Sequence, residues 1–137
     1  MSEALVVDTS VAFKWFCRID EPNLRQAFAL LEGQLADEVS LHAPASLPLE
    51  LANALRYSPL PETAALIGIE TLDLPHIELA DMTPRRLHAA AELAYLHNLS
   101  VYDALFLALA QELGCPLVTA DRRAFAGLDT EVEIRLL

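Results

Sequence analysis

The stretch ALVVDTSVAFKWF, residues 4–16, decides the fold. Ala4 to Val7 is an apolar, β-branched run of the kind that forms a buried strand. Thr9 to Phe16 has the pattern of a short helix that opens directly from this strand, and Asp8 stands at the junction. A strand that leads straight into a helix is the repeating unit of parallel sheets with flanking helices.

The rest of the chain continues this alternation of strand and helix signals. Further strands are predicted at residues 39–42, 77–79, 116–119 and 132–136. Helices are predicted at residues 24–35, 46–57, about 61–72, 83–97 and 100–114. Their boundaries rest on start signals at Ser46, Thr83 and Ser100 and on a stop signal at Gly114. This order implies a mostly parallel sheet flanked by helices.

Four acidic residues stand where a predicted strand ends or a predicted helix begins: Asp8, Glu50, Asp103 and Asp121. Right-handed crossovers bring such positions to one edge of the sheet, outside which α/β proteins bind their ligands. Carboxylates in apolar surroundings are costly unless something compensates them. Hard cations prefer carboxylate and water ligands, so the sequence predicts a Mg²⁺ or Mn²⁺ site at this edge.

Three of these acids also have a purely structural interpretation. Asp8 and Asp121 can cap the helices that begin directly after them. Asp103 lies three residues after Ser100, which is the spacing of a capping box. No single acid therefore establishes a metal site, and the prediction depends on all four together.

Glu50 is the acid that capping explains least well. It lies between Leu49 and Leu51 on a helix that is otherwise apolar. Asn53 follows one turn later, and we expect both side chains to face inward. A glutamate and an asparagine that face inward indicate a polar site rather than a solvated surface.

Six further polar side chains near the acids are candidates for supporting roles. The hydroxyl groups of Thr9, Ser10 and Thr119 are expected to orient carboxylates or water, although ordinary turn and cap chemistry explains them equally well. The cations that could hold a phosphate are Lys14, Arg122 and Arg123. Solvated surface charge is the favoured alternative for these three.

Length and charge limit the classes of protein that fit. With 137 residues, the chain is expected to form a single domain over residues 1–137. Its net charge of −11, from 20 acids against 9 Lys and Arg, argues against binding long nucleic acid by bulk electrostatics. A nuclease stays compatible, because metal ions supply positive charge locally. A basic partner protein covering the acidic face also stays compatible.

The sequence shows no signal for export or membrane insertion and no pattern of zinc ligands. No apolar run has the length of a membrane span, and the N-terminus lacks the features of a signal peptide, so a cytoplasmic protein is expected. Cys17 and Cys115 are then expected as buried thiols rather than a disulfide. The four histidines show no zinc-ligand spacing.

Three segments resemble the PIN-domain ribonucleases, and within them the VapC-type toxins of toxin–antitoxin pairs. They are VVDTSVAFKWF at 6–16, PLELANAL at 48–55 and SVYDALFLALAQELGCPLVTADRRAF at 100–125. The resemblance covers essentially the whole chain and implies a three-layer α/β/α fold with a central five-stranded parallel sheet. Asp8, Glu50, Asp103 and Asp121 match the family's four acidic positions, and the polar positions often found beside them are matched by Asn53 and Thr119.

The resemblance also implies an activity and partners. The expected reaction is metal-dependent hydrolysis of RNA by water, with Mg²⁺ or Mn²⁺, leaving 5′-phosphate and 3′-hydroxyl ends. A homodimer and a cognate antitoxin encoded alongside are expected, and Phe13, Trp15 and Phe16 suit either a protein-covered groove or core packing. Many relatives carry a further acid shortly after the fourth. Here two arginines, 122 and 123, occupy that loop, which leaves open whether one ion or two is bound.

Three other functions are compatible with parts of the pattern. A catalytically silent binding module could share the fold. A phosphatase or phosphotransfer α/β domain also places an acid after the first strand, but the haloacid dehalogenase type needs a second acid where Ser10 stands, and the paired acids and late lysine of receiver domains are missing. DNA cleavage is a third alternative, although the chain is too short for the extra elements of flap nucleases.

Overall fold

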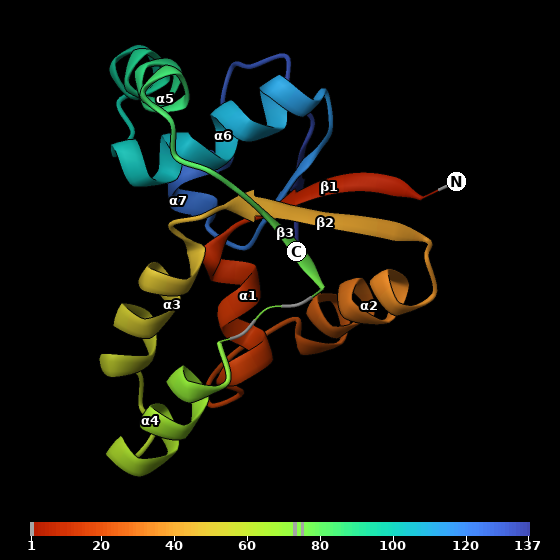
Figure 1. Cartoon of the computed structure of the whole chain (residues 1–137), viewed down its shortest axis with the longest axis vertical. Coiled ribbons are helices and arrows are strands. Elements are labelled where there is room, and N and C mark those ends of the chain that lie inside the picture. The colour runs from red at the N-terminus through yellow and green to blue at the C-terminus, as the bar shows by residue number, and fades with distance from the viewer. Residues whose placement is uncertain (1, 73, 75) are drawn as a thin grey trace.

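The computed structural model describes residues 2–72, 74 and 76–137, which form a sheet with helices on both faces (Figure 1). Residues 1, 73 and 75, which the single-domain prediction includes, lie outside this description. The first half of the chain gives β1 (Glu3–Val7), α1 (Thr9–Phe16), α2 (Leu24–Leu35), β2 (Val39–Pro44), α3 (Leu47–Arg56) and α4 (Glu62–Glu70). The second half gives β3 (Ile77–Ala80), α5 (Pro84–His97), α6 (Val101–Leu113), β4 (Leu117–Thr119), α7 (Arg122–Phe125) and β5 (Ile134–Leu136).

The described strands form one five-stranded sheet in the order β3-β2-β1-β4-β5, and every pair is parallel. The chain builds outward from β1 to β2 and β3, and then returns to the other side of β1 with β4. The topological switch point therefore lies between β1 and β4, where Val7 pairs with Val118. This topology confirms the predicted parallel α/β sheet.

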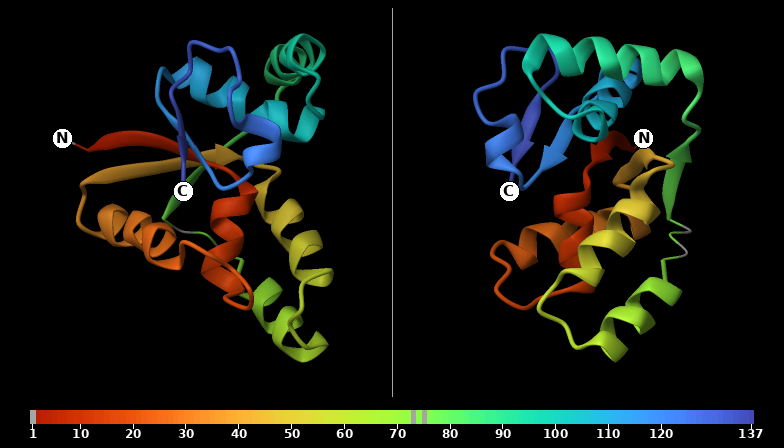
Figure 2. Two further views of the ribbon diagram at one scale, coloured as in Figure 1. Left: turned by 180° about the vertical axis from the view of Figure 1, so that it is seen from behind. Right: turned by 90° about the vertical axis from the view of Figure 1, so that its left-hand side faces the viewer.

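Helices α1 to α4 lie on one side of the sheet, and α5 and α6 lie on the other (Figure 2). Both faces of the sheet are therefore covered, which explains why the central strands β1 and β4 contain continuous buried apolar runs. The largest fully buried side chains are Phe106 of α6, Phe125 of α7 and a set of leucines that includes Leu41 and Leu117.

The aromatic residues of α1 take part in core packing. Phe13, Trp15 and Phe16 are partly buried and pack against the main core. The indole nitrogen of Trp15 also donates a hydrogen bond to the carbonyl oxygen of Ala27 at 2.8 Å, which joins α1 to α2. Of the two explanations open from the sequence, core packing is the one that these contacts support.

Element boundaries follow the sequence signals closely, with one exception at a cap. Ser100 accepts a hydrogen bond from the amide of Asp103, and Gly114 ends α6 with φ of 64°, as predicted. The prediction that Ser46 caps α3 is wrong in its chemistry. Ser46 has helical backbone angles and makes no side-chain cap bond. Its hydroxyl donates instead to Glu50 Oε2 at 3.1 Å.

The two cysteines are buried free thiols, as expected, and burial raises the pKa of the Cys115 thiol. In the part of the chain that the structure describes, no single helix has both the length and the apolar composition to cross a bilayer.

Candidate metal site at the carboxyl edge of the sheet

The switch point places two of the four acids side by side. Asp8 ends β1 and forms the N-cap of α1, and its backbone amide donates to the carbonyl of Val118 in β4 at 3.2 Å. Asp121 follows β4 after one residue and forms the N-cap of α7. Both acids therefore lie at the carboxyl ends of adjacent parallel strands, where such sheets bind ligands.

Glu50 and Asp103 reach the same edge from helices. Each stands in the first turn of its helix, α3 for Glu50 and α6 for Asp103, and each is half-buried. Burial is the main reason that the pKa values of Glu50 and Asp103 are raised; the negative charges of Asp103 and Asp8 add to the shift at Glu50, and that of Asp121 adds to the shift at Asp103. The four acids therefore lie close enough to repel one another.

Asp8 is the most buried of the four, with 4% of its surface exposed. Its Oδ1 accepts hydrogen bonds from the Ser10 hydroxyl at 2.5 Å and from the Val11 amide at 3.3 Å. Its Oδ2 accepts a hydrogen bond from the Thr119 hydroxyl at 2.6 Å. Among the described residues, every hydrogen-bond donor to this carboxylate is therefore neutral.

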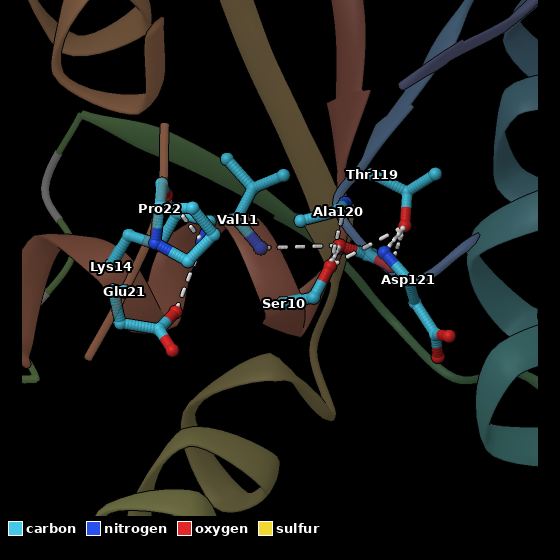
Figure 3. Close-up of polar contacts among 9 residues, drawn as sticks. Ser10, Val11, Lys14, Glu21, Pro22, Thr119, Ala120 and Asp121 are labelled. Carbon is cyan, nitrogen blue, oxygen red and sulfur yellow. Dashed lines mark hydrogen bonds and ion pairs between the residues drawn. The ribbon is translucent and has the colours of Figure 1, made fainter. Parts of the chain in front are cut away.

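The two hydroxyl groups also hold the loop that carries Asp121. The Ala120 amide donates to the Ser10 hydroxyl and the Asp121 amide donates to the Thr119 hydroxyl, both at 2.9 Å. Figure 3 shows Ser10 and Thr119 meeting beside these two amides. The end of β1 is thus tied to the β4–α7 loop through side chains rather than through the sheet alone.

Burial is the main cause of the unusual proton affinity of these acids. It raises the pKa of Asp8 to about 6, against the opposing effect of the hydrogen bonds from Ser10 and Thr119. It raises the pKa of Glu50 to about 7, with the charges of Asp103 and Asp8 adding to the shift. A carboxylate with a raised pKa is one whose negative charge lacks compensation.

The donor chemistry at this edge fits a divalent cation. All candidate donors are carboxylate or hydroxyl oxygens, which are the ligands of hard cations. None of the four carboxylates forms an ion pair with Lys or Arg in the described residues. Across residues 2–72, 74 and 76–137, however, no three Asp, Glu, His or Cys side chains are gathered tightly enough to hold an ion.

Capping and metal binding do not exclude each other at these positions. Asp8 Oδ1 caps α1 through Val11, and Asp121 Oδ1 caps α7 by accepting from the Ala124 amide at 3.1 Å. Each cap uses one oxygen of its carboxylate, and Asp8 Oδ2 accepts a further hydrogen bond from the Thr119 hydroxyl. The capping interpretation is therefore confirmed for Asp8 and Asp121, and their metal-binding role stays a prediction.

Two predicted supporting residues are placed differently by the structure. Lys14 is neither a phosphate contact nor a solvated charge, because it is only 3% exposed and its ammonium group donates to Glu21 Oε1 at 3.0 Å and to the Pro22 carbonyl at 2.8 Å. Asn53 was expected to face inward with Glu50, but it is exposed. A three-residue step rotates a helix by about 300°, which is enough to carry Asn53 off the buried face.

The other supporting candidates lie near the acids or at the rim. Thr9 has a buried hydroxyl oxygen without a hydrogen-bond partner among the described residues, although its side chain is close enough to Glu50 to lower the pKa of that carboxyl. Arg122 and Arg123 are exposed on α7, and Arg122 Nη2 donates to the Leu137 carbonyl oxygen at 3.3 Å. Their role as phosphate contacts stays a prediction.

Ser46 is a hydrogen-bond partner of Glu50, which was not predicted from the sequence. Ser46 was assigned to capping, whereas its hydroxyl binds Glu50 directly. The two residues are four apart, which is the spacing at which side chains meet on a helix. That spacing was a signal from which the contact could have been predicted.

The chain matches known proteins along most of its length. The family model described as PIN domain matches residues 5–131. A relative from Mycobacterium tuberculosis, Ribonuclease VapC1, is 33% identical over 112 residues, which cover 79% of this chain and 82% of the relative.

Solved structures share the fold at low sequence identity. VapBC2 from Rickettsia felis, bound to a DNA fragment from its promoter, matches with a TM-score of 0.68 and 16% identity over 98% of both chains. VapC20 from Mycobacterium tuberculosis, a toxin that cleaves the sarcin–ricin loop, matches with a TM-score of 0.65 and 18% identity over 90% of both chains.

Proposed function

The chain belongs to the PIN-domain family, and from that premise we propose that it is a metal-dependent endoribonuclease, the toxin of a VapBC-type toxin–antitoxin pair. One observation of the structure carries the proposal. Asp8 is buried at the switch point of a parallel sheet, its charge interacts with those of Asp121 and Glu50, and no cation of the described chain pairs with it. This arrangement suits an enzyme that takes its positive charge from solution.

The four acids would have different roles in the site. Asp8, Asp103 and Asp121 would hold the ion, and Glu50 would help to hold it or would orient the attacking water. When bound, Mg²⁺ or Mn²⁺ would neutralise charge on the phosphodiester and lower the pKa of the attacking water. Thr119 and Ser10 keep the Asp8 carboxylate in one orientation through their hydrogen bonds.

The substrate we propose is RNA, cut by water rather than by its own 2′-hydroxyl. The products then carry 5′-phosphate and 3′-hydroxyl ends. Arg122 and Arg123, exposed on the helix that follows Asp121, are the proposed phosphate contacts. Detection of a 2′,3′-cyclic phosphate among the products would refute this mechanism.

The partners we propose are an antitoxin and a second copy of the chain. The matching structures include toxin–antitoxin complexes. A net charge of −11 favours a basic antitoxin segment, whose arginine or lysine would enter the acidic site and compete with the metal. Co-purification of a short basic partner that blocks RNA cleavage is the expected result, and cleavage that is unchanged by that partner would contradict it.

Cleavage of labelled RNA tests the proposal. The panel contains single-stranded and hairpin RNAs, including a sarcin–ricin hairpin, each with Mg²⁺, Mn²⁺ or EDTA. Wild type should cut at least one RNA only with metal, and Asp8→Asn should cut none. Cleavage that survives the substitution would identify a contaminating ribonuclease.

A catalytically silent binding module is the second candidate. It is favoured by one observation, that no three potential ligands are already gathered around a point among the described residues. Titration with Mn²⁺ separates the candidates when it is combined with the RNA panel. Failure to bind Mn²⁺, together with no cleavage of any RNA, would favour the silent module.

A further inference from the structure

The two oxygens of the Asp8 carboxylate differ in their hydrogen bonding. A carboxylate oxygen has two lone-pair sites. Oδ1 uses both, for the Ser10 hydroxyl at 2.5 Å and the Val11 amide at 3.3 Å. Oδ2 uses one, for the Thr119 hydroxyl at 2.6 Å, and no other donor reaches it within the described residues. Oδ2 is therefore the oxygen with a lone pair still available.

The direction of the hydrogen bond from Ser10 is set by the β4–α7 loop. The amide of Ala120 points at the Ser10 oxygen from 2.9 Å, and an amide can only donate. The hydroxyl oxygen therefore accepts from Ala120, and its single proton is directed to Asp8 Oδ1. The Thr119 hydroxyl, 3.4 Å away, has the same arrangement, since it accepts from the Asp121 amide and donates to Oδ2.

We propose that Ser10 is a positioning residue, whose hydroxyl links the Ala120 amide to Asp8 Oδ1 and thereby reserves Oδ2 for a divalent cation. The inference rests on the proposed function, because a cation site is what gives the second oxygen a use. Without the Ser10 hydroxyl, Oδ1 keeps only the 3.3 Å bond from the Val11 amide, so the carboxylate is held less firmly. The Ala120 amide also loses its acceptor, which loosens the loop that carries Asp121.

Ser58 provides a control that separates an effect on metal binding from an effect on protein stability. The Ser58 hydroxyl donates to the Leu55 carbonyl at 2.7 Å and accepts from the Leu60 amide at 3.3 Å. It therefore makes one bond as donor and one as acceptor, as Ser10 does with Asp8 and Ala120. Ser58→Ala removes comparable bonds at the end of α3, away from the four acids.

Calorimetric titration with Mn²⁺ alone tests the inference on wild type, Ser10→Ala, Ser10→Thr and Ser58→Ala. Loss of a residue that orients a metal ligand typically weakens binding by about 10- to 100-fold, and this is the loss expected for Ser10→Ala. Ser10→Thr keeps the hydroxyl and should restore most of the affinity. Ser58→Ala should bind Mn²⁺ as wild type does, although its melting temperature falls.

The titration distinguishes an error in the role of Ser10 from an error in the proposed metal site. If wild type binds Mn²⁺ and Ser10→Ala binds it equally well, the positioning role is wrong while the proposed function stands. If wild type binds no Mn²⁺, the proposed metal site is wrong and the inference falls with it. If Ser10→Ala does not fold, Ser10→Cys replaces it, because a thiol is a weak donor of similar size. Wild-type affinity in Ser10→Cys would then overturn the inference.

Discussion

The two ends of α1 carry buried charges of opposite sign, and the chain treats them differently. At the N-terminal end, Asp8 is 4% exposed and is surrounded by neutral donors. At the C-terminal end, Lys14 is 3% exposed and is paired with Glu21 and the Pro22 carbonyl. About 9 Å of helix separates the two residues. Figure 3 shows the two clusters apart from each other.

The two buried charges differ in whether the chain itself supplies an opposite charge. The carboxylate of Glu21 compensates the charge of Lys14, so Lys14 needs no ion from solution. Among the described residues, Asp8 has hydrogen bonds but no counter-charge. Burial raises its pKa to about 6, and the negative charge of Asp121 adds a smaller effect. A buried carboxylate in that state is suited to a cation from solution.

Replacing Asp8 by Asn should have the largest effect and should act in opposite directions on activity and stability. We expect RNA cleavage to fall by about 10³-fold or more, because residues that act as a unit fail together. The metal-free protein at pH 8 should gain about 2 kcal/mol in free energy of unfolding, because the uncompensated charge is removed. Urea unfolding and the RNA panel measure the two effects.

The control for this prediction changes net charge by the same amount at an exposed acid. Asp129→Asn meets that requirement, since Asp129 is exposed. It should leave both the cleavage rate and the unfolding free energy close to wild type. Equal loss of stability and activity in Asp8→Asn would mean that Asp8 serves only as a helix cap.

Replacing Lys14 by Met should have the opposite signature. Removing one partner of a buried ion pair leaves the other uncompensated, so we expect a loss of about 3 kcal/mol in urea unfolding. Cleavage should stay close to the wild-type rate at temperatures where the variant is folded. Loss of cleavage in a folded Lys14→Met protein would place Lys14 in the site and would break the contrast between the helix ends.

A double-mutant cycle sharpens the Lys14 result. Glu21→Gln removes the other partner of the pair, and the double variant leaves neither charge. Because the residues are in contact, the loss in the double variant should be smaller than the sum of the single losses. Additive losses would show that the pair does not contribute as a unit.

Adding Mg²⁺ or Mn²⁺ should stabilise only proteins with an intact Asp8. At 100-fold excess over the dissociation constant, binding adds about 2.7 kcal/mol to the free energy of unfolding. The melting temperature should rise for wild type and for Lys14→Met and should stay unchanged for Asp8→Asn. Sodium chloride at matched ionic strength controls for screening, and an equal rise with sodium chloride would count against a specific site.

The metal-free protein should lose stability as pH rises from about 5 to about 8. Asp8 and Glu50 have folded-state pKa values of about 6 and 7, above their unfolded values of 3.8 and 4.5. In this window the folded state binds more protons than the unfolded state, so stability falls with rising pH, by on the order of 1 kcal/mol per unit. Urea unfolding at each pH measures the slope. A stability that rises across the window in EDTA would contradict the uncompensated charge at Asp8.

The sequence predicted the sheet and the acid positions because both depend on local patterns. The run from Ala4 to Val7 and the helix from Thr9 to Phe16 are where the periodicity indicated them. The parallel order and the right-handed connection rule then place Asp8 and Asp121 beside each other. Their catalytic and metal-binding roles stay predictions.

The errors at Lys14 and Asn53 concern side-chain burial, which depends on the neighbours that cover each helix rather than on a local pattern. Lys14 looks like a surface charge in sequence, and its burial depends on Glu21 and Pro22 in the loop that folds back on α1. Asn53 shares a helix with Glu50, but its exposure depends on which neighbours cover α3. The hydrogen bond from the Ala120 amide to Ser10 joins residues that are 110 positions apart, a separation beyond any periodicity.

An anomalous difference map from crystals grown with Mn²⁺ would show whether a divalent cation binds beside Asp8. We expect a peak at the carboxyl edge of β1 and β4, within ligand distance of Asp8 Oδ2 and bounded by Asp121, Asp103 and Glu50. The same crystals of Asp8→Asn should lack this peak. A map at saturating Mn²⁺ without a peak among these acids would rule out the proposed metal site.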